Sequence, residues 1–514
     1  MSAAPTVASG RSDRPEERPA RTHPSRPGVS SSLAPLLLTP LVLIVHGYHP
    51  FAGDAGIYVA GVRHILDPAL YPVNAAFVMA FARYSVFPWA IAALVRLSHL
   101  PLSAVLLAAQ LLSAFLFLAA IRALAVRLFT RESAHWCSTL LAAACFTLPV
   151  AGTALFIMDP YATARSFSTP LSLMAVAACM DRAWPRTVLL LAMAGLIHPL
   201  MAFYALAFVV LHALVSSGRT RAAIGLCLAA LIACAFAFAL AHRSPVSPGY
   251  REAVALPPRT FLFLARWRWY EVLGLVLPLL LFFLGLRQWG LASRKGALCL
   301  TCLAAGITSC LVAALFVPVK GPYPLVPFQV LRSFHLIYAL GIGFAGGILS
   351  GLFARSRLAA ASLTIVLFAA MFANQHVSWS GSRPVEWPGL QPSNPWQQAF
   401  VWIRGNTPRD AVFAFDPRLV YLPLEEEQGF RAIAERDHLA DDKDAGIVVV
   451  IPSLAARWAR QRNAQFAVDG MSDAERIAAL TPLGATWILL PPDGETALPC
   501  PYSNGVVKIC RIAR

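Results

Sequence analysis

The feature that most constrains this chain is the recurrence of apolar runs close to 20 residues long. A helix of about 20 residues crosses the roughly 30 Å hydrocarbon core of a bilayer. Of the 514 residues, 58% are hydrophobic and only 13% are charged, and the mean hydropathy is +0.62. Soluble domains carry about 25% charged residues. The sequence therefore predicts a polytopic α-helical membrane protein.

The formal net charge of +16 is interpreted as a membrane-orientation signal, not as a sign of nucleic-acid binding. Arginines cluster between apolar runs, and cytoplasmic loops carry an excess of basic residues. Residues 1–31 are rich in Ser, Pro and Arg and nearly free of large apolar side chains. They are predicted to form a disordered cytoplasmic tail.

Eleven spans are predicted within a membrane domain of residues 32–375. With a cytoplasmic N-terminus, this odd number places the C-terminus outside the membrane. The predicted spans are roughly 33–48, 101–123, 137–157, 168–181, two short halves between Arg186 and Arg219, 221–242, 270–287, 297–318, 330–352 and 357–374.

Residues 49–100 are predicted to form one long external loop. Its apolar stretch 76–99 contains Arg83 and Arg96, which favours helices lying on the membrane surface; the alternative is that 76–99 crosses the membrane.

Further along, "GIGFAG" at 341–346 lies inside an apolar run. It is interpreted as close helix packing around Gly343 and Gly347, not as a dinucleotide site.

The composition changes at about residue 376. After a linker of residues 376–394, Asn394 and Pro395 mark the start of a helix, as N-cap and first helical residue. "AVFAFD", "IVVVIP" and "ATWILLPP" are predicted as buried strands, and "SDAERIAALTPLG" as a capped helix. This alternation predicts a small external α/β domain over residues 395–514.

Two cysteines in this domain, Cys500 and Cys510, flank the hairpin signal Asn504-Gly505. A disulfide between them would suit an oxidising compartment. A simple hairpin centred on Asn504-Gly505 instead pairs Cys500 with Ile509, one residue out of register. Both arrangements stay open.

Asp54, in "GDAG" just after the first span, is the leading catalytic candidate. A carboxylate at this depth is costly and points to function, and it could act as general base for an acceptor hydroxyl or amine. The alternative is that Asp54 only caps the helix that follows. His49 is a candidate neighbour in substrate binding, and Asp67, before Pro68, is predicted to end the helix.

Three further candidates lie in other predicted outer segments. Asp159 and Arg165 belong to the external loop "MDPYATARSF", which a compact bundle would bring near residues 49–100. Asp159-Pro160 also favours a turn. His198 stands at the outer turn of the two short halves, where it is either a substrate ligand or a structural histidine.

Arg332 and His335 lie one turn into the tenth span, in "VLRSFHLIY". A guanidinium binds phosphate bidentately, which favours Arg332 as a phosphate ligand over an arginine that reaches the interface by snorkelling. Arg266 and Arg268 lie in "RTFLFLARWRWYE". They indicate either a docking surface for an anionic lipid carrier or an interfacial aromatic belt.

This plan resembles the GT-C superfamily of integral-membrane glycosyltransferases. The resemblance covers the architecture of residues 33–374: a long first external loop with an acid near its start (Asp54), a second acid in a later loop (Asp159), a polar residue at a short helical pair (His198) and an external domain after the last span. "WIRGNTPRDAVFAFD" and "GFRAIAERDHLADDKD", within 396–444, are similar to the C-terminal part of bacterial membrane proteins related to that superfamily.

The resemblance implies a glycosyltransferase of the bacterial inner membrane, with a polyprenyl-phosphate-linked sugar as donor and a glycan, lipid or protein as acceptor. Asp54 would be the base, Arg332 with Arg165 or His198 would hold the phosphate, and transfer would invert the anomeric carbon. "GDAG" has one acid where many members have paired acids, which leaves a divalent cation open. The alternative function is a non-catalytic transporter or assembly protein for lipid-linked glycans.

Overall fold

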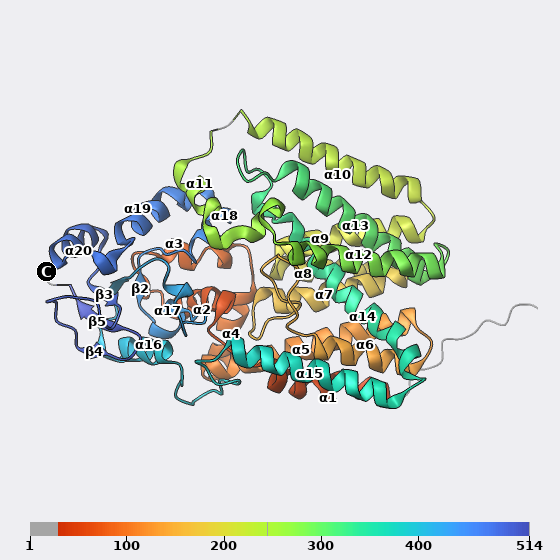
Figure 1. Cartoon of the computed structure of the whole chain (residues 1–514), viewed down its shortest axis with the longest axis horizontal. Coiled ribbons are helices and arrows are strands. Elements are labelled where there is room, and N and C mark those ends of the chain that lie inside the picture. Colours follow the sequence, from red (N-terminus) through yellow and green to blue (C-terminus); the bar gives the residue numbers. More distant parts are fainter. Residues whose placement is uncertain (1–28, 244, 513–514) are drawn as a thin grey trace, which may run out of the picture.

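The computed structural model describes residues 29–243 and 245–512, and it is built from a long helical bundle and a smaller C-terminal unit with a sheet (Figure 1). The predicted tail, 1–31, lies almost wholly outside the described residues. The bundle helices are α1 (Val29–His46), α5 (Leu102–Leu128), α6 (Glu132–Ala144), α7 (Ala164–Met180), α8 (Trp184–Ile197), α9 (Pro199–Ser216), α10 (Thr220–Ala241), α12 (Trp269–Trp289), α13 (Arg294–Phe316), α14 (Phe334–Phe353) and α15 (Arg357–Ser378).

Each of the eleven predicted spans overlaps one of these helices, but the span predicted at 137–157 is helical only up to Ala144, where α6 ends, and the rest of it is irregular. Seven helices among the described residues are long and apolar enough to cross a membrane, namely α5, α9, α10, α12, α13, α14 and α15. The other four have 13 to 18 residues, so their crossing stays a prediction. The polytopic helical class is confirmed.

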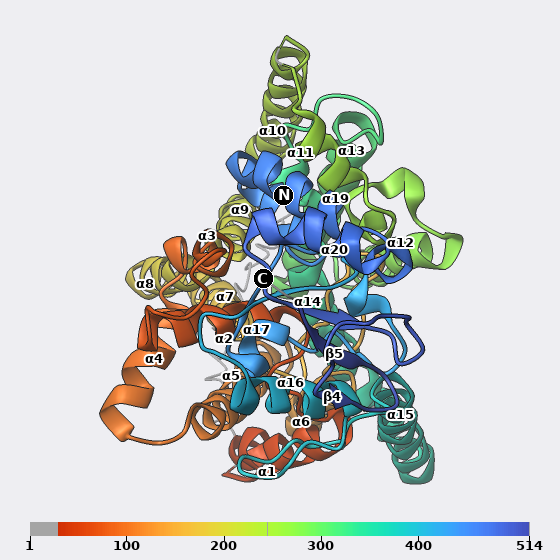
Figure 2. The same ribbon diagram turned by 90° about the vertical axis from the view of Figure 1, so that its left-hand side faces the viewer.

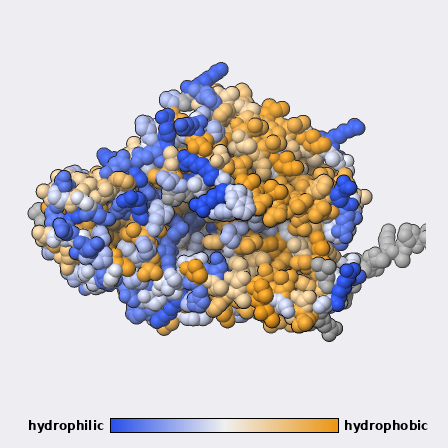
Figure 3. Space-filling view, in the orientation of Figure 1, coloured by the Kyte–Doolittle hydropathy of each residue, from blue (hydrophilic) through white to orange (hydrophobic). Residues whose placement is uncertain are grey.

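The surface of the bundle matches this assignment. Apolar side chains cover the part of the molecule in which the long helices run, and hydrophilic side chains predominate over the C-terminal unit (Figure 3). α10 and α15 are each only 6% buried over their most apolar stretch. Because such surfaces are costly in water, they are suited to contact with lipid.

The segment after α1 contains short helices. They are α2 (Gly53–Leu66), α3 (Ala75–Val78), the 3-10 turn η1 (Phe81–Arg83) and α4 (Phe87–Ser98). α4 has 12 residues, which at 1.5 Å per residue is about 18 Å, well short of a bilayer core. A second irregular segment, between α10 and α12, holds α11 (Pro248–Ala255), η2 (Pro257–Leu262) and η3 (Leu264–Arg266).

The C-terminal unit has a five-stranded sheet in the order β2-β1-β3-β5-β4. β1 runs parallel to β2 and β3, whereas β5 is antiparallel to β3 and β4. Its strands are β1 (Val412–Ala414), β2 (Asp437–His438), β3 (Trp487–Leu490), β4 (Tyr502–Ser503) and β5 (Lys508–Arg511), and its helices are α16 (Pro395–Asn406), α17 (Phe430–Ala434), α18 (Ala445–Val450), α19 (Ala455–Gln465) and α20 (Asp473–Leu480).

Most of the helices and strands predicted for this unit are present in the structure. The Asn394 carboxamide accepts hydrogen bonds from the N–H groups of Trp396 and Gln397, at 2.9 and 3.2 Å, and so caps α16. The strand predicted for "IVVVIP" is wrong, because residues 447–450 of this stretch lie in the helix α18. The Asp441 carboxylate accepts the Asp444 N–H at 2.8 Å just before this helix, and the apolar side chains of α18 are buried against α11 and α19.

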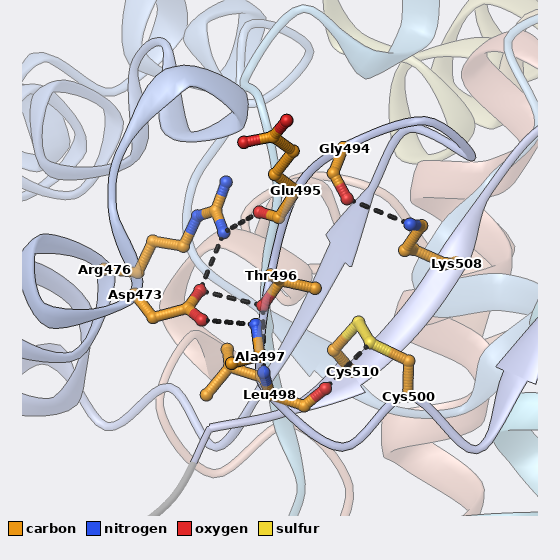
Figure 4. The surroundings of a disulfide bond; sticks show 10 residues. All are labelled: Asp473, Arg476, Gly494, Glu495, Thr496, Ala497, Leu498, Cys500, Lys508 and Cys510. Atoms are coloured by element: carbon orange, nitrogen blue, oxygen red, sulfur yellow. Dashed lines mark hydrogen bonds and ion pairs between the residues drawn. A yellow bond between two sulfur atoms is a disulfide. The ribbon is translucent and has the colours of Figure 1, made fainter.

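Cys500 and Cys510 form a disulfide (Figure 4). The strands pair Tyr502 with Ile509 and Ser503 with Lys508, so a four-residue connection replaces the simple two-residue hairpin. The neighbouring segment is held by Asp473, which accepts from Thr496 and Ala497 at 2.8 and 2.7 Å. The disulfide thus links β5 to the segment that leads into β4, the edge strand of the sheet.

Candidate functional site

Asp54 lies in the first turn of α2, and α2 lies beside α17 of the C-terminal unit (Figure 2). The N-cap of this helix is Ala52, and no side chain supplies a capping hydrogen bond. The alternative of Asp54 as N-cap is therefore wrong. Its side chain is 40% exposed, so the carboxylate is free to meet a ligand.

Arg165 joins Asp54 to the second predicted acid. One guanidinium nitrogen, Nη1, lies 3.4 Å from Asp54 Oδ2, and Nη2 lies 2.7 Å from Asp159 Oδ2. Thr163 and Ser166 form a capping box at the start of α7, which sets Arg165 in the first helical turn. The structure thus brings Asp54 together with Asp159 and Arg165, which lie more than 100 residues later in the chain.

Asp159 is deeply buried, at 2% exposure. The Gln110 side chain donates to its backbone carbonyl at 2.9 Å, and its Oδ1 has no hydrogen-bond partner among the described residues. Burial and the neighbouring Asp54 carboxylate outweigh Arg165 and raise the pKa of Asp159 to about 6. Its charge is therefore sensitive to pH near neutrality.

The pKa of Asp54 moves in the opposite direction. Burial favours the neutral acid, but the positive charges of Arg165, Lys443 and Arg332 outweigh burial and hold the pKa of Asp54 below its usual value. Asp54 is therefore ionised at neutral pH. One site thus holds two carboxyl groups with separated pKa values, an arrangement typical of functional sites.

Arg332 lies in the 3-10 turn η5 (Val330–Ser333), directly before α14. Its guanidinium stacks over the Phe261 ring at 5.0 Å. Its Nε is buried and finds no acceptor among the described residues. Arg332 is therefore a cation near Asp54 with hydrogen-bonding capacity left for a ligand.

Two predicted histidines lie beside this group. His198 ends α8 and caps α9, accepting the Met201 N–H at 3.5 Å; it is within electrostatic reach of Asp54, Arg165 and Arg332. His335 Nε2 bonds the Ile157 carbonyl oxygen at 2.8 Å and is 3% exposed. His198 can still approach a ligand, whereas His335 fixes the loop that carries Asp159.

Three predicted binding residues lie elsewhere. His49 is fully buried, stacks on Trp379 at 3.9 Å and bonds Glu386 at 3.0 Å, so it fastens the 376–394 segment to the bundle. Arg266 bonds the Ala255 carbonyl oxygen at 3.4 Å. Arg268 lies next to the Tyr270 hydroxyl, at 3.1 Å. None of the three has a described contact with Asp54 or Arg332.

Two further residues belong to the site but are not among the predicted site residues, although Arg259 begins the basic loop "RTFLFLARWRWYE". Lys443, in "ADDKD", adds a positive charge near Asp54. Arg259, in η2, donates to the Asp442 carbonyl oxygen at 2.9 Å. The signal for Lys443 is a lone lysine among three aspartates, which by itself looks like a solvated charge run.

The donor set around Asp54 does not fit a divalent cation. Ca²⁺ and Mg²⁺ require several oxygen ligands, but a guanidinium occupies the space between the carboxylates of Asp54 and Asp159. Within 29–243 and 245–512, no group of three or more His, Cys, Asp and Glu residues is placed to hold a metal. Positive charge at this site comes from the chain itself.

No protein-family model matches the sequence, and no curated protein sequence matches it either. Among solved structures, the chain is similar to the archaeal oligosaccharyltransferase AglB from Archaeoglobus fulgidus, in complex with an inhibitory peptide and a dolichol-phosphate. The sequences are 10% identical, the TM-score is 0.50, and the match covers 90% of this chain and 70% of that chain. The likeness confirms the predicted GT-C-like fold, a polytopic bundle with a C-terminal soluble unit.

Proposed function

We propose that this protein is a glycosyltransferase that moves a sugar from a polyprenyl-phosphate donor to an acceptor outside the cytoplasm. The observation that carries the proposal is an accessible, ionised Asp54 within electrostatic reach of Arg332, whose Nε finds no acceptor among the described residues. A carboxylate can take a proton from an acceptor. An arginine can hold a phosphate oxygen bidentately.

The reaction uses both groups in one displacement. The acceptor hydroxyl or amine gives its proton to Asp54, and its oxygen or nitrogen forms a bond to the anomeric carbon of the sugar. The bond between that carbon and the phosphate oxygen breaks, and polyprenyl phosphate leaves with the electron pair. Arg332 stabilises the negative charge that develops on the leaving oxygen, and the transfer inverts the anomeric carbon.

The surrounding residues have supporting roles. Arg165 holds Asp54 and Asp159 in fixed positions, and His198 lies within reach of the donor phosphate. The similar oligosaccharyltransferase is bound to a lipid phosphate and a peptide, which supports a lipid-linked donor here. The acceptor is a glycan, lipid or protein, and the protein acts in a bacterial inner membrane with its C-terminal unit in the periplasm.

The experiment is Asp54→Asn in the purified full-length protein, with a pool of labelled polyprenyl-phosphate sugars and membrane extract as the acceptor source. Loss of the base is expected to lower transfer by about 100-fold or more. Asp67→Asn is the matched control, because Asp67 ends the same helix and pairs with Arg409 at the surface.

A second substitution tests the phosphate ligand. Arg332→Lys keeps the charge but loses the bidentate geometry, so the KM for the lipid donor is expected to rise. Transfer at the wild-type rate in Asp54→Asn would overturn the proposal. It would favour a non-catalytic transporter or assembly protein for lipid-linked glycans.

A further inference from the structure

The C-terminal unit makes direct backbone contacts with the residues just before Asp54. The Gly53 N–H donates to the Glu427 carbonyl oxygen at 2.9 Å, and the Gly429 N–H donates to the Phe51 carbonyl oxygen at the same distance. Ala52 and Gln428 form an antiparallel bridge between these bonds. The residues that lead into Asp54 are thus paired, like a short strand, with 427–429.

Two glycines allow this close approach. A Cβ on Gly429 would lie 2.6 Å from the Gly56 Cα, and a Cβ on Gly56 would lie 2.8 Å from the Gly429 Cα. Real Cβ atoms essentially never come so near backbone atoms. The contact between α2 and the C-terminal unit therefore depends on both residues lacking a side chain.

Lys443 lies beside this contact, in a segment (441–444) that several arginine side chains hold in place. Arg462 Nε lies 2.7 Å from Asp442 Oδ1, Arg431 binds Asp444 through two hydrogen bonds of 2.9 and 3.0 Å, and Arg259 holds the Asp442 carbonyl oxygen. These arginines fix the residues before and after Lys443. The Lys443 ammonium forms an ion pair with Glu427, and both side chains line a cavity of about 50 Å³ together with Gly53 and Gly56.

The segment that fixes Lys443 also touches the candidate phosphate ligand. Arg259 contacts the C-terminal unit, and Phe261, two residues later in η2, lies under the Arg332 guanidinium. η2 therefore contacts both Arg332 and the segment of Lys443. A displacement of the C-terminal unit would disturb both sides of the site.

We propose that Lys443 is a positioning residue of the Asp54 site, supplied by the C-terminal unit, and that the site is complete only when segments 427–429 and 441–444 are docked on α2. This inference rests on the proposed function. Lys443 adds a fixed positive charge beside Asp54, and the backbone pairing sets the orientation of the first turn of α2. Partners that bind the C-terminal unit could then alter the rate of transfer.

The role of Lys443 is tested with Lys443→Met, Lys443→Arg and the control Lys508→Met. Lys508 belongs to the same unit, but its ammonium bonds the Gly494 carbonyl oxygen at the far edge of the sheet. Lys443→Met is expected to lower kcat about tenfold with little change in the KM of the lipid donor, because it removes the ion pair with Glu427, and Glu427 is the residue whose backbone carbonyl holds Gly53 next to Asp54. Lys443→Arg is expected to restore most of kcat, and Lys508→Met to leave it unchanged. A rise in KM alone, or failure of arginine to restore kcat, would overturn the positioning role.

The docking is tested without any activity measurement. Hydrogen exchange of the peptide covering residues 51–58 is compared in the wild type, Gly429→Val and Gly470→Val. A valine at 429 cannot approach Gly56, so exchange at Gly53 is expected to rise at least tenfold. No atom lies within 4 Å of the position that a Cβ on Gly470 would take, so Gly470→Val should match the wild type. Unchanged exchange in Gly429→Val would contradict the docking, whereas absent transfer by the wild type would contradict only the proposed function.

Discussion

At the scale of single residues, the site is defined by a bridging guanidinium. Arg165 is 5% exposed and contacts two carboxylates, so neither carboxylate is left as an uncompensated charge inside the protein. Buried charges are retained only when they are paired or functional. Arg332, by contrast, forms no ion pair with a carboxylate of the described residues, and it is therefore more suited than Arg165 to bind an anion.

The raised pKa of Asp159 gives a testable pH dependence. Below about pH 6 Asp159 gains a proton, so its ion pair with Arg165 weakens and Arg165 is drawn to Asp54 alone, which makes Asp54 a poorer base. As pH falls through this midpoint, transfer is therefore expected to drop to a lower plateau set by the weaker base. In Asp159→Asn the limb near pH 6 should disappear and the plateau should be lower. A rate profile of Asp159→Asn that keeps a midpoint near 6 would assign that limb to another group.

Part of this group of site residues can be predicted from the sequence alone. Asp54, Asp159 and Arg332 stand out because ionisable side chains near predicted spans are expensive. His49 has the same signal but serves packing, because Trp379 and Glu386, more than 300 positions away, surround it. Lys443 carries no such signal. Its position depends on tertiary contacts that no local pattern encodes.

At the scale of elements, hydrophobic periodicity predicts the long helices well, but it does not distinguish a strand from a helix in short buried runs. Ten of the eleven predicted spans are mostly helical, since a long apolar run has few other structures open to it in lipid, whereas the span predicted at 137–157 leaves the helix after Ala144. "IVVVIP" has strong strand propensity, yet it forms α18, because β1 already pairs with β2 and β3 on its two sides. Tertiary context overrides propensity where the run is only six residues long.

The packing of α14 against α6 allows a prediction at this scale. A Cβ on Gly346 would lie 2.6 Å from the Cys137 carbonyl oxygen, and the Ser138 hydroxyl donates to the Gly343 carbonyl oxygen at 2.7 Å. Gly346→Leu should separate the two helices and lower the free energy of unfolding by about 1–3 kcal/mol, the usual cost of overpacking. Thermal unfolding in detergent measures this loss. Gly351→Leu is the control on the same helix, because its added side chain meets open space; equal loss in both variants would contradict the packing argument.

At the scale of the whole molecule, the candidate site lies where the membrane bundle meets the C-terminal unit (Figure 1). α2, the Asp159 loop, η2 and η5 all reach this boundary from different parts of the chain. The basic residues of links such as "RQWGLASRKG" predict that these links are cytoplasmic and that this boundary is external.

This orientation is tested with a membrane-impermeant maleimide on intact cells, using one added cysteine at a time in a protein whose eight free native cysteines are replaced by alanine. Gly470→Cys lies on an exposed part of the C-terminal unit, and Ala292→Cys lies on an exposed predicted cytoplasmic link. Only Gly470→Cys should react before the cells are opened, and both should react afterwards. The native Cys500–Cys510 disulfide gives an independent readout, because disulfides persist in oxidising compartments: both thiols should resist labelling until a reductant is added. Labelling of Ala292→Cys in intact cells would reverse the topology and, with it, the external placement of Asp54.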